Sequence, residues 1–105
     1  MKLTLASKET RVDLRHLGRK NERLIMKELE RLAPLAADPG FETRNLKTLR
    51  ENAVAQRELR LWGKVRVLFN VDVERRTVIL VVVGLKRRAA LIVRGREYHM
   101  HRAAP

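Results

Sequence analysis

The chain has 105 residues, of which 45% are hydrophobic and none is cysteine, and its formal net charge is +12. This length suits one domain with a modest core, and the lack of cysteine excludes disulfides and thiolate metal sites. The longest apolar run, residues 78–83, is too short to span a bilayer, and residues 1–9 lack the apolar run of a secretion signal. We therefore expect a single domain over residues 1–105 that is soluble, cytoplasmic and without a membrane partner.

Positive charge is concentrated in the second part of the chain. Residues 1–43 carry nine basic and seven acidic residues, a net of +2, whereas residues 44–105 carry fifteen basic and five acidic residues, a net of +10. A positive potential on one part of a small domain attracts polyanions, and nucleic acid is the commonest of them. The alternative is an arginine-rich surface that is only solvated.

The N-terminal part of the sequence predicts a short strand and two helices. Residues 2–6 have the pattern of a strand, Ser7 can cap a helix, and Gly18 can end that helix. A second helix is expected from about Asn21, and Pro34 either kinks or ends it. Its apolar residues recur at helical spacing: Leu24, Ile25, Leu29, Leu32 and Ala36. Residues 37–52 have the composition of a loop.

The remaining residues predict an antiparallel sheet. Strands are expected at about 56–61, 64–72 and 77–85, with a further short strand after residue 89 and a flexible tail over about 99–105. Alternation in the second strand places Arg66 on the face opposite to Val65 and Val67. Residues 78–83 are apolar on both faces, as in a central strand that is covered on both sides. The predicted fold class is α+β, with an N-terminal strand and a two-helix hairpin packed on a small, mainly antiparallel sheet.

Three motifs in this order are informative together: "LKTLRENAVAQRELRLWGKVRVLFNVD" (46–72), "TVILVVVGLKRR" (77–88) and "LIVRGREYH" (91–99). With the order of elements, they resemble the toxins of the RelE/ParE superfamily, and the resemblance covers about residues 20–98. It implies a type II toxin–antitoxin system, in which a small, partly disordered antitoxin binds the toxin in a hetero-oligomer. The apolar surface left on the sheet and the helix hairpin also suggests either such an antitoxin or self-association.

The resemblance implies one of two activities, because some members cleave messenger RNA in the ribosomal decoding site and others inhibit DNA gyrase. We expect a metal-independent, ribosome-associated mRNA endoribonuclease that needs no cofactor. The alternatives are a ParE-like gyrase inhibitor without nuclease activity and a basic nucleic-acid-binding module without toxicity, because a fold does not choose among functions.

Cleavage of RNA without a metal needs a base for the 2′-hydroxyl proton, cations around the anionic phosphorane, and a proton donor for the leaving 5′ oxygen. The resemblance assigns Arg66 to the scissile phosphate. The alternative for Arg66 is an ion pair with Glu58 on the neighbouring strand. One of three residues that follow Gly84 is expected to give a second phosphate contact or the proton donor, unless they form a solvated basic turn: Lys86, Arg87 and Arg88.

Proton transfer is less clearly assigned. Tyr98 and His99 are candidates by their chemistry and their late position, although both are bystanders if the tail is frayed. Ribonuclease members carry two lysines in the strand before the glycine turn, where this chain has Arg57, Glu58 and Arg60. Glu58 is therefore a candidate base, provided that its pKa is raised.

Other basic and aromatic residues are candidate nucleic-acid contacts. Trp62 can stack on a base or can pack on its hairpin neighbours. His99 and His101 could form a metal pair, but no third ligand is identifiable, so no metal site is predicted. The predicted nucleic-acid-binding residues are Lys47, Arg57, Arg60, Trp62, Lys64 and Lys86.

Overall fold

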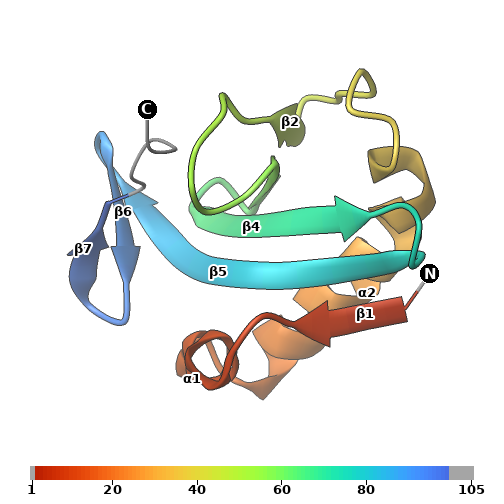
Figure 1. The fold of residues 1–105 in the computed structure, drawn as a ribbon. Coiled ribbons are helices and arrows are strands. Elements are labelled where there is room, and N and C mark those ends of the chain that lie inside the picture. The colour runs from red at the N-terminus through yellow and green to blue at the C-terminus, as the bar shows by residue number, and fades with distance from the viewer. Residues whose placement is uncertain (1, 100–105) are drawn as a thin grey trace.

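A seven-stranded sheet with two helices on one face makes up residues 2–99, the part that the computed structural model describes (Figure 1). The fold class is the predicted α+β class, with an N-terminal strand, two helices and a mostly antiparallel sheet. The elements in chain order are β1 (Lys2–Leu5), α1 (Lys8–His16), α2 (Arg19–Ala36), β2 (Leu46–Thr48), β3 (Arg57–Leu61), β4 (Val65–Asp72), β5 (Thr77–Arg87), β6 (Ala90–Val93) and β7 (Arg96–Tyr98).

The helix boundaries follow the local chemistry that the sequence indicates, with two corrections. Ser7 caps α1, because its Oγ accepts a hydrogen bond from the Thr10 N–H at 3.3 Å. Gly18, at φ 90°, separates the helices, and α2 begins at Arg19 rather than near Asn21. Pro34 lies inside α2 and does not end it. Its missing N–H removes one bond from the last turns, and buried neighbours on both sides still hold that turn on the core.

Strand β5 is the central strand of the sheet. It pairs in parallel with β1 over residues 77–80, and it pairs in antiparallel fashion with β4 along its length and with β6 over residues 85–87. The order is β2-β3-β4-β5-β6-β7, with β1 beside β5. The prediction that residues 78–83 form a central strand is therefore confirmed.

Two short strands, β2 and β7, were not expected where they occur, whereas β6 is the short strand predicted after residue 89. Strand β2 lies inside the predicted loop, and the C-terminal segment forms a hairpin, β6–β7, instead of one strand. Strand β5 also continues two residues beyond the predicted end at residue 85. Strands of three or four residues are too short to show alternation, and only their pairing with longer strands defines them.

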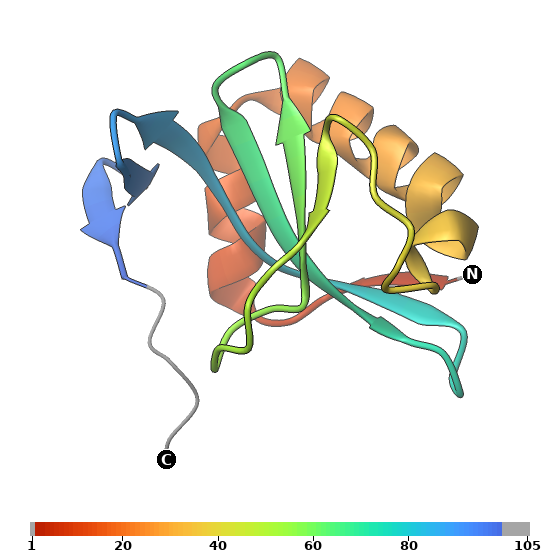
Figure 2. The ribbon, with the colours of Figure 1, turned by 90° about the horizontal axis from the view of Figure 1, so that it is seen from above.

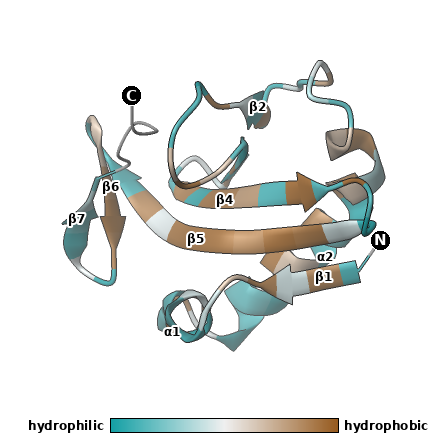
Figure 3. Cartoon of the chain, viewed as in Figure 1, coloured by the Kyte–Doolittle hydropathy of each residue, from teal (hydrophilic) through white to brown (hydrophobic). Residues whose placement is uncertain are grey.

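Apolar clusters lie on both faces of the sheet. The main core packs Val65, Val67 and Phe69 of β4 against the helices. A smaller cluster on the other face, here called the helix-free face, contains Leu68 and Val82. Segment 49–55 and the β6–β7 hairpin cover this second cluster. Figure 3 shows the resulting hydrophobic band along β5.

The end of β5 curves and carries β6–β7 as a wall at one side of the helix-free face, as Figures 1 and 2 show. Gly84 allows the close approach of β6 at this point, because a Cβ there would lie 2.6 Å from the Ile92 carbonyl oxygen. On the helix-free face, segment 49–55 and the terminal hairpin therefore flank β3–β5 (Figure 2).

No helix between residues 2 and 99 is long and apolar enough to cross a membrane. Within the same residues, no group of three His, Asp or Glu side chains could hold a metal ion. His101 lies outside the described residues, and so does the predicted tail beyond His99.

Candidate nucleic-acid interface

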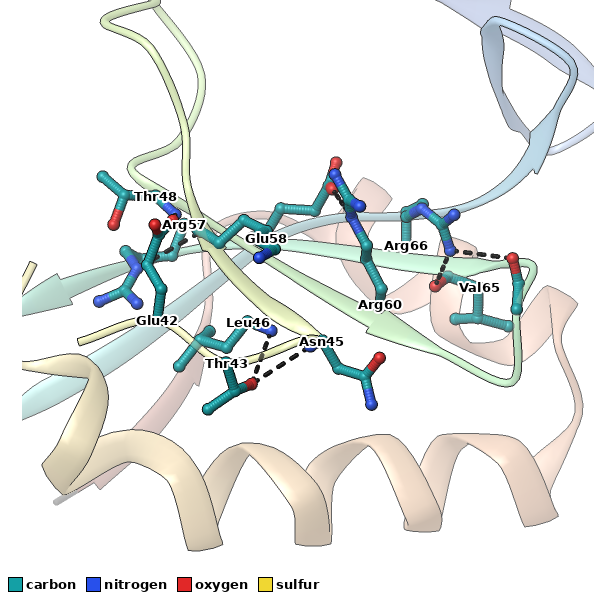
Figure 4. Close-up of polar contacts among 12 residues, drawn as sticks. Glu42, Thr43, Asn45, Leu46, Thr48, Arg57, Glu58, Arg60, Val65 and Arg66 are labelled. Carbon is teal, nitrogen blue, oxygen red and sulfur yellow. Dashed lines mark hydrogen bonds and ion pairs between the residues drawn. The ribbon is translucent and has the colours of Figure 1, made fainter. Parts of the chain in front are cut away.

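Strand alternation brings two arginines together on the helix-free face. Arg60 of β3 lies directly opposite Arg66 of β4, and Arg66 lies opposite Gly84 of β5. The neighbours of Arg66, Val65 and Val67, belong to the core on the helix side. Figure 4 shows both guanidinium groups on the side of the sheet away from α2. The predicted placement of Arg66 on the strand face is thus confirmed.

Backbone carbonyls orient the Arg66 side chain. Its Nη1 donates to the carbonyl oxygens of Gly63 at 3.2 Å and Val65 at 3.1 Å (Figure 4). No carboxylate within residues 2–99 forms an ion pair with this half-buried guanidinium. Nε and Nη2 also have no hydrogen-bond acceptor in that part of the chain, so they remain able to bind an anion such as a phosphate.

Glu58 pairs with Arg60 rather than with Arg66. The Arg60 Nε lies 2.7 Å from Glu58 Oε1, and both residues belong to β3. Across the sheet, Glu58 faces Leu68. The proposed ion pair between Arg66 and Glu58 is therefore wrong. As a candidate base, Glu58 has one carboxylate oxygen occupied by a guanidinium.

The register of β5 distinguishes the three basic residues after Gly84. Lys86 is two residues beyond Gly84, so its side chain shares the face of Arg66. Arg87 falls on the opposite face, and Arg88 occupies the β5–β6 turn with φ 53°. Lys86 is therefore the one of the three that alternation places beside Arg66.

Tyr98 lies in the same part of the helix-free face. In β7 it pairs with Leu91, which in turn pairs with Lys86. Tyr98 packs against the second apolar cluster, and burial, with a smaller effect of the Asp13 carboxylate, raises the pKa of its phenol. A phenol with a raised pKa stays protonated at neutral pH and can donate a proton. His99 follows β7 and is exposed.

Arg57 is a structural residue and leaves the set of candidate nucleic-acid contacts. Only 2% of its surface is exposed, because alternation turns it toward the helix side. Its guanidinium donates to the carbonyl oxygens of Ala36 at 2.8 Å and Asp38 at 3.1 Å, and also to that of Phe41. Burial lowers its pKa, and nearby Glu42 and Asp38 oppose that change.

The other predicted nucleic-acid contacts lie near Arg60 and Arg66. Lys47 of β2 pairs with Glu58, so it shares the helix-free face, and Lys64 is exposed beside the β3–β4 turn. Trp62 forms that turn with φ 50° and is 53% exposed. It borders a small hollow with Leu24 and Arg60 at the sheet edge. The tryptophan is thus accessible for stacking beside the paired arginines.

Arg96 is a residue that sequence reasoning missed. It pairs with Val93 of β6, whose Cγ2 would lie 2.9 Å from a Cβ at Gly84, the β5 residue opposite Arg66. Arg96 therefore belongs to the exposed basic rim of the helix-free face. The available signal was Gly95, because two-residue hairpin turns favour glycine at positions with positive φ, as Gly95 has at 77°.

The helix-free face thus gathers cations around the half-buried Arg66. Its Nε and Nη2 groups have no acceptor within residues 2–99 and can bind an anion. Among known proteins, the chain matches no family model and has no significant match to a curated protein or a solved structure.

Proposed function

We propose that the helix-free face binds the backbone of single-stranded RNA and that the protein is a RelE-like toxin, a metal-independent endoribonuclease acting on ribosome-bound messenger RNA. The observation that carries the proposal is Arg66, a guanidinium near the start of β4 that is oriented by two carbonyls and has no carboxylate partner in residues 2–99. Keeping such a group half-buried is costly unless it binds an anion. The element order of strand, two helices and antiparallel sheet supports the resemblance.

The proposed reaction is attack of a ribose 2′ oxygen on the adjacent phosphorus. The new bond joins the 2′ oxygen to phosphorus, the bond from phosphorus to the 5′ oxygen breaks, and the products are a 2′,3′-cyclic phosphate and a 5′-hydroxyl. Arg66 would stabilise the negative charge that develops on the phosphorane oxygens, because its fork matches two oxygens at once. Lys86, on the same face, would add a second cation.

Proton transfer would involve Tyr98 and Glu58. Tyr98 lies in the same cross-strand row as Lys86, a position from which its phenol would donate to the leaving 5′ oxygen, although burial raises its pKa and weakens it as an acid. Glu58 would accept the 2′ proton once RNA phosphate competes for Arg60. In this proposal Arg88 binds a flanking phosphate from the β5–β6 turn, and Arg87, on the opposite face of β5, does not act at the reacting atoms.

The proposal includes the partner that the resemblance implies, a cognate antitoxin, and a cytoplasmic location, where ribosomes are. Two exposed apolar side chains that line one hollow, Leu24 and Trp62, offer such a partner a contact surface.

One observation favours the second candidate, a ParE-like toxin that inhibits DNA gyrase without cleaving RNA. Glu58, the candidate base on the helix-free face, is engaged by Arg60 at 2.7 Å, and β3 carries no lysine. A gyrase inhibitor needs the basic surface but no proton acceptor.

Inducible expression in bacteria, followed by mapping of messenger RNA ends, tests the proposal. We expect growth arrest with new RNA ends from the native protein and neither from Arg66→Ala. Arg75→Ala is the matched control, because Arg75 lies in the β4–β5 turn and its side chain is 85% exposed. Arrest with intact RNA would favour gyrase inhibition. A folded product that causes no arrest would leave a nucleic-acid-binding module without toxicity.

A further inference from the structure

A hollow in the helix layer is lined by four basic side chains. Arg15 comes from α1, and Arg19, Arg23 and Lys27 come from successive turns of α2. All four residues are exposed, and two acidic residues, Glu22 and Glu30, also line the hollow. We call this surface the helix groove. It lies in the layer on the other side of the sheet from the helix-free face.

The cations of the helix groove outnumber its two acidic residues, Glu22 and Glu30, so the chain neutralises them only in part. Within residues 2–99, none of the four forms an ion pair, although Glu22 lies only three residues from Arg19 in the same helix. Arg19 and Arg23 are four residues apart, as are Arg23 and Lys27. Like charges at this spacing repel each other along one side of a helix and destabilise it. This repulsion remains in the free protein, and a bound polyanion would remove it.

The small net charge of residues 1–43 does not reveal the helix groove, because several acidic residues of that segment lie near basic residues outside the groove. Asp13 is buried beside Arg94, and Glu28 pairs with Arg31 on another side of α2. Asp38 and Glu42 lie near Arg57. The helix groove therefore has twice as many basic as acidic residues, four against two, whereas the whole segment has nine against seven.

We propose that the helix groove binds the sugar–phosphate backbone of a second segment of structured RNA. Three cations repeat every four residues along α2, which is a spacing of about 6 Å, and a row of this kind suits a linear array of phosphates. The lining contains one large apolar side chain, Met26, and a membrane surface or an acidic protein segment would need more apolar anchors. The helix groove and the helix-free face lie in different layers of the molecule. A folded RNA that contacts both must therefore use a different segment for each.

This inference goes beyond the proposed function and does not rest on cleavage or toxicity. It can be tested with the full-length protein and two probes, a single-stranded RNA of about eight nucleotides, short enough to occupy only one face, and an RNA hairpin of about 16 base pairs. The test variant is Arg19→Gln/Arg23→Gln/Lys27→Gln. The control removes the same charge outside the groove, with Lys8→Gln/Arg75→Gln/Arg76→Gln, all at exposed positions. Thermal melts establish that both variants fold.

For the hairpin, we expect the groove variant to lose at least tenfold in affinity at about 0.1 M salt. Its slope of log affinity against log salt should also fall by about two to three, as expected for three lost phosphate contacts. The short single strand should bind to the groove variant as it does to the control.

Equal losses in the groove variant and in the control would overturn the proposal, as would tighter binding of anionic vesicles than of the hairpin. Failure of the native protein to cleave RNA would count against the proposed function only. The affinity of the two variants for the RNA hairpin would still show whether the helix groove binds RNA.

Discussion

At the scale of single residues, Arg57 shows how a charge can be part of a core. It donates to carbonyl oxygens at the end of α2 and in the following turn, and therefore ties that segment to β3. Replacing it with leucine would leave several buried or partly buried carbonyls without a donor.

We expect Arg57→Leu to lower the free energy of unfolding by about 3 kcal/mol or more, measured by urea denaturation. Arg57→Lys should recover only part of this loss, because one ammonium cannot reach carbonyls on three sides. Arg75→Ala, at an exposed position, should change stability by less than about 0.5 kcal/mol. Equal stability of Arg57→Leu and Arg75→Ala would show that Arg57 is not structural.

Asp13 should give stability a pH dependence of unusual sign for a carboxylate. Burial raises its pKa, against the opposing effect of Arg94, whose Nε lies 2.8 Å from Asp13 Oδ1. The N–H is not aligned with that oxygen, so the contact is an ion pair without a good hydrogen bond. Because the folded pKa lies above the unfolded value, the native state binds the proton more tightly. Stability from this residue is therefore present below about pH 4 and is lost as pH rises through the folded pKa.

The variant Asp13→Asn removes this titration while leaving every other carboxylate in place. We expect the variant to gain stability relative to the native protein between about pH 3 and pH 7, measured by urea denaturation at both values. A constant difference, or a change of opposite sign, would mean that the pair with Arg94 outweighs burial.

Trp62 occupies a left-handed backbone conformation that asparagine adopts more readily. We expect Trp62→Asn to keep or raise stability by up to about 1 kcal/mol. Its affinity for single-stranded RNA should fall by about 1–3 kcal/mol, as for one lost base stack, measured by fluorescence anisotropy. Unchanged affinity would make the tryptophan a packing residue of the hairpin only.

The residues of the site could be predicted as far as strand alternation reaches. The alternation of β4 correctly placed Arg66, and the same rule applied to β3 would have separated Arg57 from Glu58 and Arg60. The partner of Glu58 could not be predicted, because Arg60 Nε approaches it along one strand and not across the sheet. Carbonyl contacts such as those of Arg66 depend on turn geometry that residue types do not specify.

At the scale of elements, the close approach of β5 and β6 depends on Gly84. A methyl group at this position would lie 2.6 Å from the Ile92 carbonyl oxygen and 2.9 Å from Val93 Cγ2. The strands must then separate, and the β6–β7 hairpin would leave the second apolar cluster.

We expect Gly84→Ala to cost about 1–3 kcal/mol and to increase hydrogen exchange over residues 90–98 before the rest of the sheet. The control is Gly40→Ala, where the new methyl group meets only the Asp38 carboxylate, at 3.3 Å. Unchanged exchange in the terminal hairpin would contradict this account of the curved end of β5.

Long, periodic elements were predictable and short ones were not. The Ser7 cap, the apolar spacing of α2 and the apolar run of β5 specify those elements locally. Strand β2 has three residues and depends on its pairing with β3, so nothing in its own sequence distinguishes it from a loop. The curvature at Gly84 likewise depends on the packing of β6 against the glycine. The residue types around Gly84 do not specify this packing.

At the scale of the whole molecule, positive charge gathers on two surfaces, the helix-free face and the helix groove. The helix-free face carries Arg60, Arg66 and Lys86, while the helix groove carries a second row of cations on the other layer. Net charge by segment predicted only the first of these surfaces, because several acidic residues of the N-terminal segment lie outside the groove while Glu22 and Glu30 line it.

The central claim is that Arg66 binds the phosphate at which RNA is cleaved. The most direct measurement is the sequencing and end analysis of messenger RNA on purified, programmed ribosomes after incubation with the native protein or Arg66→Ala, with Arg75→Ala as the control. We predict cleavage to a 2′,3′-cyclic phosphate by the native protein and by Arg75→Ala, and a loss of at least a hundredfold in rate for Arg66→Ala, the order expected for a removed transition-state contact. Cleavage by Arg66→Ala at the native rate, or intact RNA with every protein, would contradict the claim.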